Sequence, residues 1–169
     1  MDFFRAKSRS QQLREEVIRR MRAAFGFGRP SDSTYEDYGP LQWPGADLAG
    51  VDLSRLNMSY RGDTDLRHAD LTGANLEGTN LNDANLADAK LTGARARGVA
   101  LSCANLSGVD FTDADLRDAN LNNVLLGGAI FVRTDLRGTR GFHQRDGGPP
   151  AVFRDCLGEE YVLQQPSNR

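Results

Sequence analysis

The chain of 169 residues has few of the residues that build common metal and catalytic sites. It contains only two cysteines, Cys103 and Cys156, and two histidines, His68 and His143. The cysteines have neither zinc-binding spacing nor the number needed for a disulfide framework, and nothing in the sequence places the histidines together. We therefore predict a protein that is not an enzyme and needs no metal or cofactor.

Long apolar runs and a strong net charge are also missing. No segment approaches the ~18 apolar residues of a membrane-spanning helix, and the first residues, MDFFRAKSRSQQLREE, lack the apolar stretch of a secretory signal. The formal net charge is −2, and no basic surface with interleaved aromatic residues is present, so we predict no direct contact with nucleic acid. From these absences we expect a cytoplasmic protein.

A five-residue period dominates what the sequence does contain. An apolar residue, leucine in twelve of fifteen repeats, recurs at every fifth position from Leu66 to Leu136, and a small residue stands two places before each one. Three earlier units centre on Leu48, Leu53 and Met58, and the gap of eight before Leu66 indicates a three-residue insertion. Unbroken repetition of this kind outranks other sequence signals because it indicates a repeat architecture.

Neither regular element accommodates this period. On an α-helix, a step of five carries each leucine around the axis, and on a continuous strand an odd step sends successive leucines to opposite faces. A chain that turns a corner in every repeat buries all of them. The second position after each leucine is mostly Gly, Asp or Asn, which suits such corners. The position just before the leucine points outward and is Asp or Asn in ten of fifteen repeats.

The motif A-(D/N)-L-x-x, as in Ala69-Asp70-Leu71 and Ala74-Asn75-Leu76, resembles the pentapeptide-repeat family. The resemblance implies an all-β solenoid, a right-handed quadrilateral β-helix with four repeats per coil, over residues 46–140. Residues twenty apart should then stack, so that Leu76, Ala96 and Leu116 lie above one another. Ala96 occupies a leucine position, where we expect local repacking with help from Val99.

The segments outside the repeats have different characters. Residues 1–28 read as a basic amphipathic α-helix with an apolar stripe at every fourth position. The stripe is an interface candidate and comprises Leu13, Val17, Met21 and Phe25. We expect this helix to cap the open end of the solenoid; the alternatives are binding to a partner protein and, with less support, adsorption to an anionic membrane surface. Residues 29–45 form a connector, and residues 141–169 a C-terminal connector with a capping or dimerisation segment. The family resemblance implies a homodimer through that end.

Three apolar residues break the outward polar pattern in the last full coil: Leu125, Ile130 and Val132. An exposed apolar patch usually marks an interface or a covered surface. We expect the C-terminal tail to cover it, with a second copy or the N-terminal helix as alternatives.

Two functional hypotheses follow. The first is a non-catalytic protein-interaction or assembly module, in which the N-terminal helix or the apolar residues contact a protein partner. The alternative comes from the resemblance: some bacterial pentapeptide-repeat proteins mimic duplex DNA, bind DNA gyrase or topoisomerase IV, and protect them from quinolones or other gyrase poisons.

Mimicry would place carboxylates where DNA carries phosphates. The candidates are Asp65, Asp70, Asp83, Asp88, Asp110, Asp113, Asp115 and Asp118. The insertion near Tyr60, Arg61 and Gly62 resembles in kind the loops that such proteins direct at their partner. Arginines interrupt one face, so the repeat region is nearly neutral and strong mimicry is disfavoured.

Overall fold

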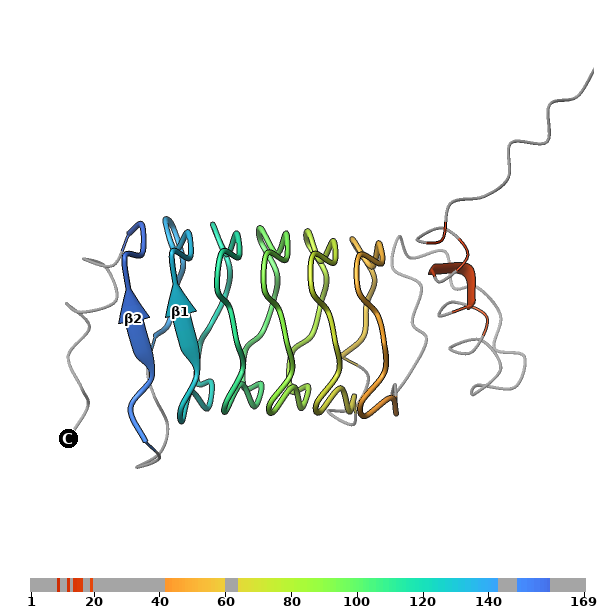
Figure 1. Ribbon diagram of the computed structural model, residues 1–169, viewed down its shortest axis with the longest axis horizontal. Helices are drawn as coiled ribbons and strands as arrows, with labels where there is room; N and C mark the ends of the chain where they lie inside the picture. Colours follow the sequence, from red (N-terminus) through yellow and green to blue (C-terminus); the bar gives the residue numbers. More distant parts are fainter. Residues whose placement is uncertain are drawn as a thin grey trace, which may run out of the picture.

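The computed structural model describes residues 9, 12, 14–16, 19, 42–59, 64–142 and 149–158. Residues 42–59, 64–142 and 149–158 form a column of stacked coils, and the chain advances along the column from one end to the other (Figure 1). The fold is a β solenoid, as the five-residue period predicts.

Four ladders of parallel backbone pairing run along the column. One joins Asp52, Asn75, Arg95, Asp115 and Asp135. Most steps cover twenty residues, which is four repeats per coil. The first step of each ladder, such as Asp52 to Asn75, is three residues longer, so the insertion lies between the first and second coils and leaves the stacking intact.

The interior contains the small and large apolar residues of every repeat. The side chains of Leu76, Ala96 and Leu116 are at most 1% exposed, and they belong to consecutive coils of one ladder. The amide of Leu76 donates to the carbonyl of Arg95 at 2.7 Å, and the amide of Ala96 to that of Asp115 at 2.8 Å. The prediction that these three positions stack is therefore confirmed.

Hydrogen bonding explains why Asp and Asn precede the buried leucine. In the repeat 69–73, the backbone N–H groups of Asp70, Leu71 and Gly73 pair with adjacent coils, and that of Ala69 pairs with Leu66. The remaining N–H, on Thr72, donates to the carboxylate of Asp70 at 3.0 Å. The outward Asp or Asn thus supplies the one acceptor that the backbone lacks, and every N–H of the repeat is satisfied.

The corner position has a left-handed backbone in all seventeen repeats in which it is described. Gly73 has φ of 64° and Asp83 has φ of 60°. Glycine adopts this conformation without steric cost, and Asn and Asp tolerate it better than other residues do. The prediction that this position forms the corner is confirmed.

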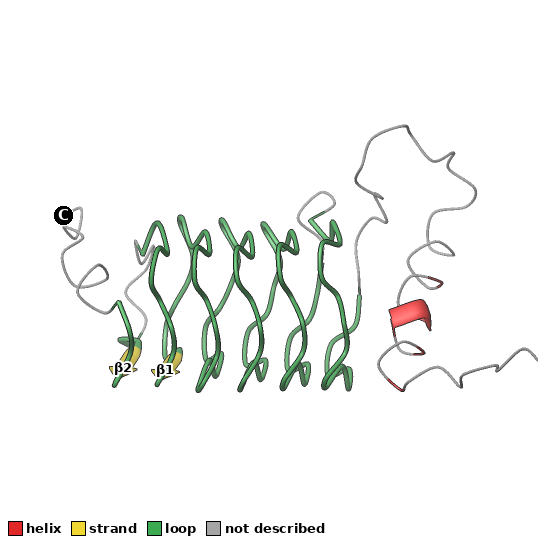
Figure 2. Ribbon diagram, turned by 90° about the horizontal axis from the view of Figure 1, so that it is seen from above, coloured by secondary structure: helices red, strands yellow, loops and turns green. Residues whose placement is uncertain are grey.

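Two segments of the described column pair over three consecutive residues and form the strands β1 and β2, both near its C-terminal end. Strand β1, Ile130–Val132, pairs in parallel with strand β2, Val152–Arg154, and Phe131 faces Phe153 in the register. Figure 2 shows the two strands side by side at the last two coils. The period fails after Arg140, yet residues 149–158 return to the column and add a further partial coil, with Leu157 paired to Asp135.

An aromatic stack inside the column holds this last partial coil. The ring of Phe131 is parallel to those of Phe111 at 5.0 Å and Phe153 at 4.8 Å between centroids. Phe142 contacts Phe131 and Phe153 edge-on, each at 6.0 Å. Stacked and edge-to-face rings are the favoured aromatic geometries, so the stack anchors β2 to β1.

Several predictions fall outside the described residues. They concern the amphipathic stripe (Leu13, Val17, Met21 and Phe25), the insertion residues Tyr60, Arg61 and Gly62, and the final segment 159–169. The N-terminal helix over 1–28 likewise remains a prediction.

Candidate interaction surface

Three apolar side chains form a patch on one side of the C-terminal end of the column. Ile130 and Val132 belong to β1, and Val152, the backbone partner of Ile130, belongs to β2. Ile130 is 37% exposed and Val152 44% exposed, whereas Val132 is half-buried. We call Ile130, Val132 and Val152 the apolar end patch.

Ile130 stands at the position where most repeats carry Asp or Asn. In the coil below, Asp110 at this position accepts the backbone N–H of Thr112 at 2.9 Å. An isoleucine cannot accept a hydrogen bond, so the repeat with Ile130 forgoes that stabilisation and exposes an apolar side chain to water. Both consequences are unfavourable for the isolated column.

The other apolar departures lie on different sides. Leu125 is half-buried and pairs with Asn105 on the preceding ladder, and Leu157 is 54% exposed and pairs with Asp135 on the following one. Of the three apolar residues singled out from the sequence, Ile130 and Val132 therefore share a strand, while Leu125 lies one side further round.

Residues 149–158 bear on the expectation that the C-terminal tail covers the patch. They pair edge to edge with β1 and extend the outer face with Val152; they leave Ile130 exposed. Val152 and Leu157 were missed in the sequence because the steps that bring them into register, from Ile130 and Asp135, span 22 residues. The only sequence signal was the short apolar run Ala151–Phe153.

Charged groups border the patch. At the adjacent corner, the guanidinium of Arg133 contacts the carboxylate of Asp113 at 2.6 Å. This contact lowers the pKa of Asp113 through the hydrogen bonds and charge of Arg133. Arg154 and Asp155 follow at exposed positions on and after β2. A largely apolar centre with a charged rim is the usual composition of a protein–protein contact.

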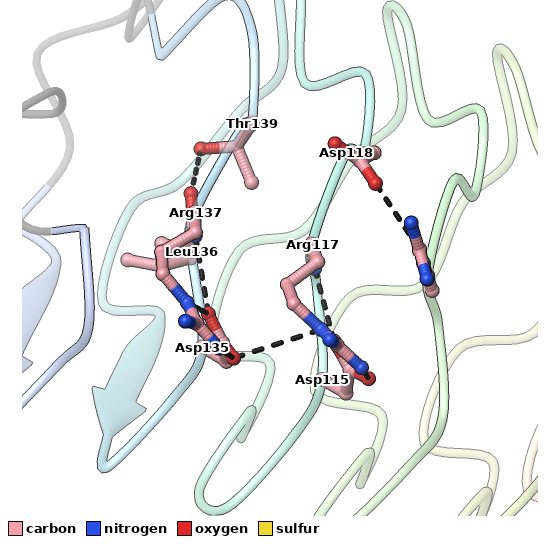
Figure 3. A network of polar contacts seen from close by, with 8 residues as sticks. Asp115, Arg117, Asp118, Asp135, Leu136, Arg137 and Thr139 are labelled. Atoms are coloured by element: carbon pink, nitrogen blue, oxygen red, sulfur yellow. Dashed lines mark hydrogen bonds and ion pairs between the residues drawn. The ribbon is translucent and has the colours of Figure 1, made fainter.

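The next side of the column carries a network of alternating charges (Figure 3). Arg117 contacts Asp115 at 2.6 Å and Asp135 at 3.6 Å, and Arg137 contacts Asp135 at 2.6 Å. Hydrogen bonds from Arg117 and Arg137 lower the pKa values of Asp115 and Asp135, respectively. The arginines and aspartates neutralise one another, so this side is zwitterionic.

The eight acidic candidates do not gather on one side. Four of them stand just before a buried residue and accept a backbone N–H; these are Asp65, Asp70, Asp110 and Asp115. The other four occupy left-handed corners; these are Asp83, Asp88, Asp113 and Asp118. Four of the eight are paired with arginines, namely Asp65, Asp113, Asp115 and Asp118. The set is spread over all four sides, and its members have a structural role in the turns.

Other kinds of site receive no support from the described residues. They contain no group of three or more His, Cys, Asp or Glu side chains placed to hold a metal ion. In the same ranges, no helix has the length and apolar character that a membrane span requires. Cys103 and Cys156 are both free thiols.

Comparison with known families and structures agrees with the repeat geometry. Residues 64–140 match the model of the pentapeptide repeat region. These residues belong to the pentapeptide-repeat family. Members of this family are typically structural or interaction proteins, and the comparison with curated proteins found no match.

Three solved pentapeptide-repeat structures illustrate the range of similarity. The chain is 25% identical to Rfr23 from the cyanobacterium Cyanothece 51142, with a TM-score of 0.55, over 67% of this chain and 84% of Rfr23. A protein from the thylakoid lumen of Arabidopsis thaliana is 29% identical over 70% of this chain and 74% of its own, with a TM-score of 0.47. QnrB1, a plasmid-mediated fluoroquinolone resistance protein, is 21% identical over 66% and 67%, with a TM-score of 0.35.

Proposed function

We propose that this pentapeptide-repeat protein is a non-catalytic protein-interaction module. A rigid right-handed quadrilateral β-helix presents the apolar end patch to a protein partner. The observation that carries the proposal is the exposure of Ile130 and Val152 on neighbouring strands. At the position of Ile130, most repeats carry an Asp or Asn that stabilises the turn.

Replacing Ile130 with asparagine separates a binding role from a structural one. Ile130→Asn restores the side-chain acceptor that most repeats have, so the column should keep or gain stability in urea denaturation. The same change removes apolar contact area at the centre of the patch, so binding of the partner should weaken. A purely structural Ile130 predicts lower stability instead.

A matched control exists on the same ladder. Lys90 occupies the equivalent position two coils away, and Lys90→Asn also restores the acceptor without touching the patch. Partners captured by the wild-type chain and by Lys90→Asn should coincide, and Ile130→Asn should lose them. Capture of the same partners by all three proteins would refute the proposal. Light scattering on the same variants tests whether the partner is a second copy.

The DNA-mimic alternative draws less support from this surface. Arginines neutralise half of the candidate carboxylates, and the remaining four, Asp70, Asp83, Asp88 and Asp110, do not form one stripe. A mimic needs a sustained negative potential along one side. A supercoiling assay with purified gyrase, with and without ciprofloxacin, tests the idea directly. Inhibition or protection at micromolar protein would favour it over the interaction module proposed above.

A further inference from the structure

The two ends of the column differ in how their backbone groups are satisfied. Within the column, each coil offers carbonyls to the coil before it. Asn75 accepts from the amide of Leu53 at 2.8 Å, and Glu77 accepts from the amide of Arg55 at 2.9 Å. The equivalent carbonyls of the first coil are those of Asp52 and Ser54. No preceding coil supplies their donors within the described part of the chain.

A guanidinium group takes the place of the missing coil. Nη1 of Arg14 donates to the carbonyl oxygen of Asp52 at 2.6 Å, and Nη2 donates to that of Ser54 at 3.3 Å. Two nitrogens of one planar group thus occupy the places of two backbone N–H groups. Nη1 also lies 3.3 Å from the Asp52 carboxylate, and the Arg14 side chain is only 28% exposed.

Hydrogen bonds from groups other than Arg14 also hold the carboxylate of Asp52 in place. Its Oδ1 atom accepts the amide N–H of Ser54 at 3.0 Å and the side-chain amide of Asn75 at 3.1 Å. Partial burial acts to raise the pKa of Asp52, but the hydrogen bonds from Ser54 and the charges of Arg14 and Arg95 hold it below its ordinary value. The group is therefore ionised at neutral pH and oriented toward the open edge.

A neighbouring arginine shows what an ordinary surface contact looks like here. Arg9 meets Asp47 at 3.1 Å, and both side chains are well exposed. Exposed pairs of this kind contribute little. Arg14 differs because its guanidinium is a planar fork with several donors in fixed directions. This group contacts the two carbonyls and the carboxylate at the same time, which a lysine ammonium cannot do equally well.

We propose that the edge of the first coil, formed by the Asp52 and Ser54 carbonyls and the Asp52 carboxylate, is a guanidinium-binding site. Arg14 is its resident ligand, and an arginine side chain of another polypeptide enters the site when Arg14 is withdrawn. This surface lies at the opposite end of the column from the apolar end patch and does not depend on the function proposed for that patch.

The test uses the full chain with Arg14→Ala and the small probe N-ethylguanidinium, followed by NMR of the backbone amides. We expect saturable shifts at Asp52, Ser54 and Asn75 in Arg14→Ala and none in the wild type, whose site is filled. N-ethylammonium at equal ionic strength should give none. The double variant Arg14→Ala/Asp52→Asn should bind at least about tenfold more weakly, since it lacks the charge-assisted contact.

Arg9→Ala is the matched control, because it also removes one arginine of the same segment that contacts a first-coil aspartate. It should behave like the wild type. Equal responses to the two probes, an equal response in Arg9→Ala, or no response in folded Arg14→Ala would each overturn the proposal. If Arg14→Ala does not fold, Arg14→Lys retains the charge without the fork and should show the same selectivity for the guanidinium probe.

A peptide of residues 8–20 tests the second half of the proposal. It should bind Arg14→Ala, and the same peptide carrying Arg14→Gln should not. Binding of ethylguanidinium without binding of the peptide would overturn the exchange with other polypeptides. Light scattering of a mixture of wild-type and Arg14→Ala chains then tests the source: mixed dimers identify a second copy as the donor of the arginine, and monomers exclude a second copy.

Discussion

The aromatic stack provides a graded test of how the C-terminal partial coil is held. Phe131 takes part in three ring pairs, with Phe111, Phe153 and Phe142. Among the described residues, Phe153 takes part in two such pairs and Phe111 in one. Substitution by leucine keeps an apolar side chain of moderate size at each position and removes these pairs. The three leucine variants should therefore differ according to the pairs lost.

The magnitude follows from the geometry. Each favourable ring pair contributes about 0.5–1.5 kcal/mol beyond its buried area. The Phe111 ring stays paired with Phe131 when β2 opens, so only the pairs of Phe131 with Phe153 and Phe142 contribute to the docking of the last partial coil. Phe131→Leu should therefore weaken that docking by roughly 1–3 kcal/mol if the pairs are additive. Since about 1.4 kcal/mol corresponds to a tenfold change in an equilibrium constant, local opening of the last partial coil should rise by roughly five- to 150-fold. Contacts in a solenoid are mostly with nearest neighbours, so distant coils should hardly respond.

Amide hydrogen exchange measures this opening at individual residues. The amide of Val152 donates to Ala129 and that of Leu157 donates to Thr134, so both should exchange faster in Phe131→Leu. The amide of Leu76, four coils away from the last partial coil, serves as the internal control. The effect should be larger in Phe131→Leu and Phe153→Leu than in Phe111→Leu. Equal effects in the three variants, or faster exchange throughout the column, would refute the stack as the anchor of β2.

Three further predictions concern the repeats themselves. The pKa values of Asp115 and Asp135 are lowered in the folded state by hydrogen bonds from Arg117 and Arg137. The stability that these carboxylates contribute is complete above the unfolded pKa of ~3.9 and is lost as the pH falls through the folded values. Asp115→Asn/Asp135→Asn should therefore reduce the loss of stability at acidic pH in urea-unfolding experiments, and an unchanged loss would contradict this. Thr134→Val should lower the free energy of unfolding in urea by about 1 kcal/mol, because the buried hydroxyl donates to the Phe111 carbonyl at 2.8 Å. The loss is limited to this one bond, since the carbonyl oxygen still accepts from the amide of Ala114. An unchanged free energy would show that the hydroxyl contributes nothing. Gly158→Ala should lower the thermal unfolding temperature more than Gly93→Ala does. Both glycines have positive φ, but a Cβ at 158 would lie 2.9 Å from the Arg137 amide nitrogen, whereas a Cβ at 93 would meet nothing within 4 Å. Equal losses of stability in the two variants would contradict the close contact.

The sequence predicts the column well because one constraint recurs in every repeat. Leu76, Ala96 and Leu116 could be placed on one ladder from the period alone, since four corners per coil bring every twentieth residue together. The corner backbone at Gly73 and Asp83 followed from residue type. The insertion between the first two coils was visible as a longer gap. Local geometry and global stacking agree at these positions, so each supports the other.

The contacts that depend on tertiary structure could not be predicted. Val152 enters the fold after a connector of irregular length, and its register depends on tertiary contacts such as that of the Phe153 ring with Phe131. Arg14 looked like one of several basic residues on a helix face; its role depends on carbonyls that become unpaired only because the column begins there. Asp70 and Asp110 looked like free surface charges, but they accept backbone hydrogen bonds within their own turns.

The twenty-residue step has a consequence for changes in chain length. An insertion or deletion of one five-residue unit between Leu91 and Leu116 would rotate everything beyond it by a quarter turn around the column axis. Ile130 and its neighbours would then lie on a different side of the column relative to Arg14, although every buried contact could form again. Only the gain or loss of a whole coil would keep the two ends in the same rotational orientation. Such a change would lengthen or shorten the column by one coil, so the distance between its ends can vary only in steps of fixed size.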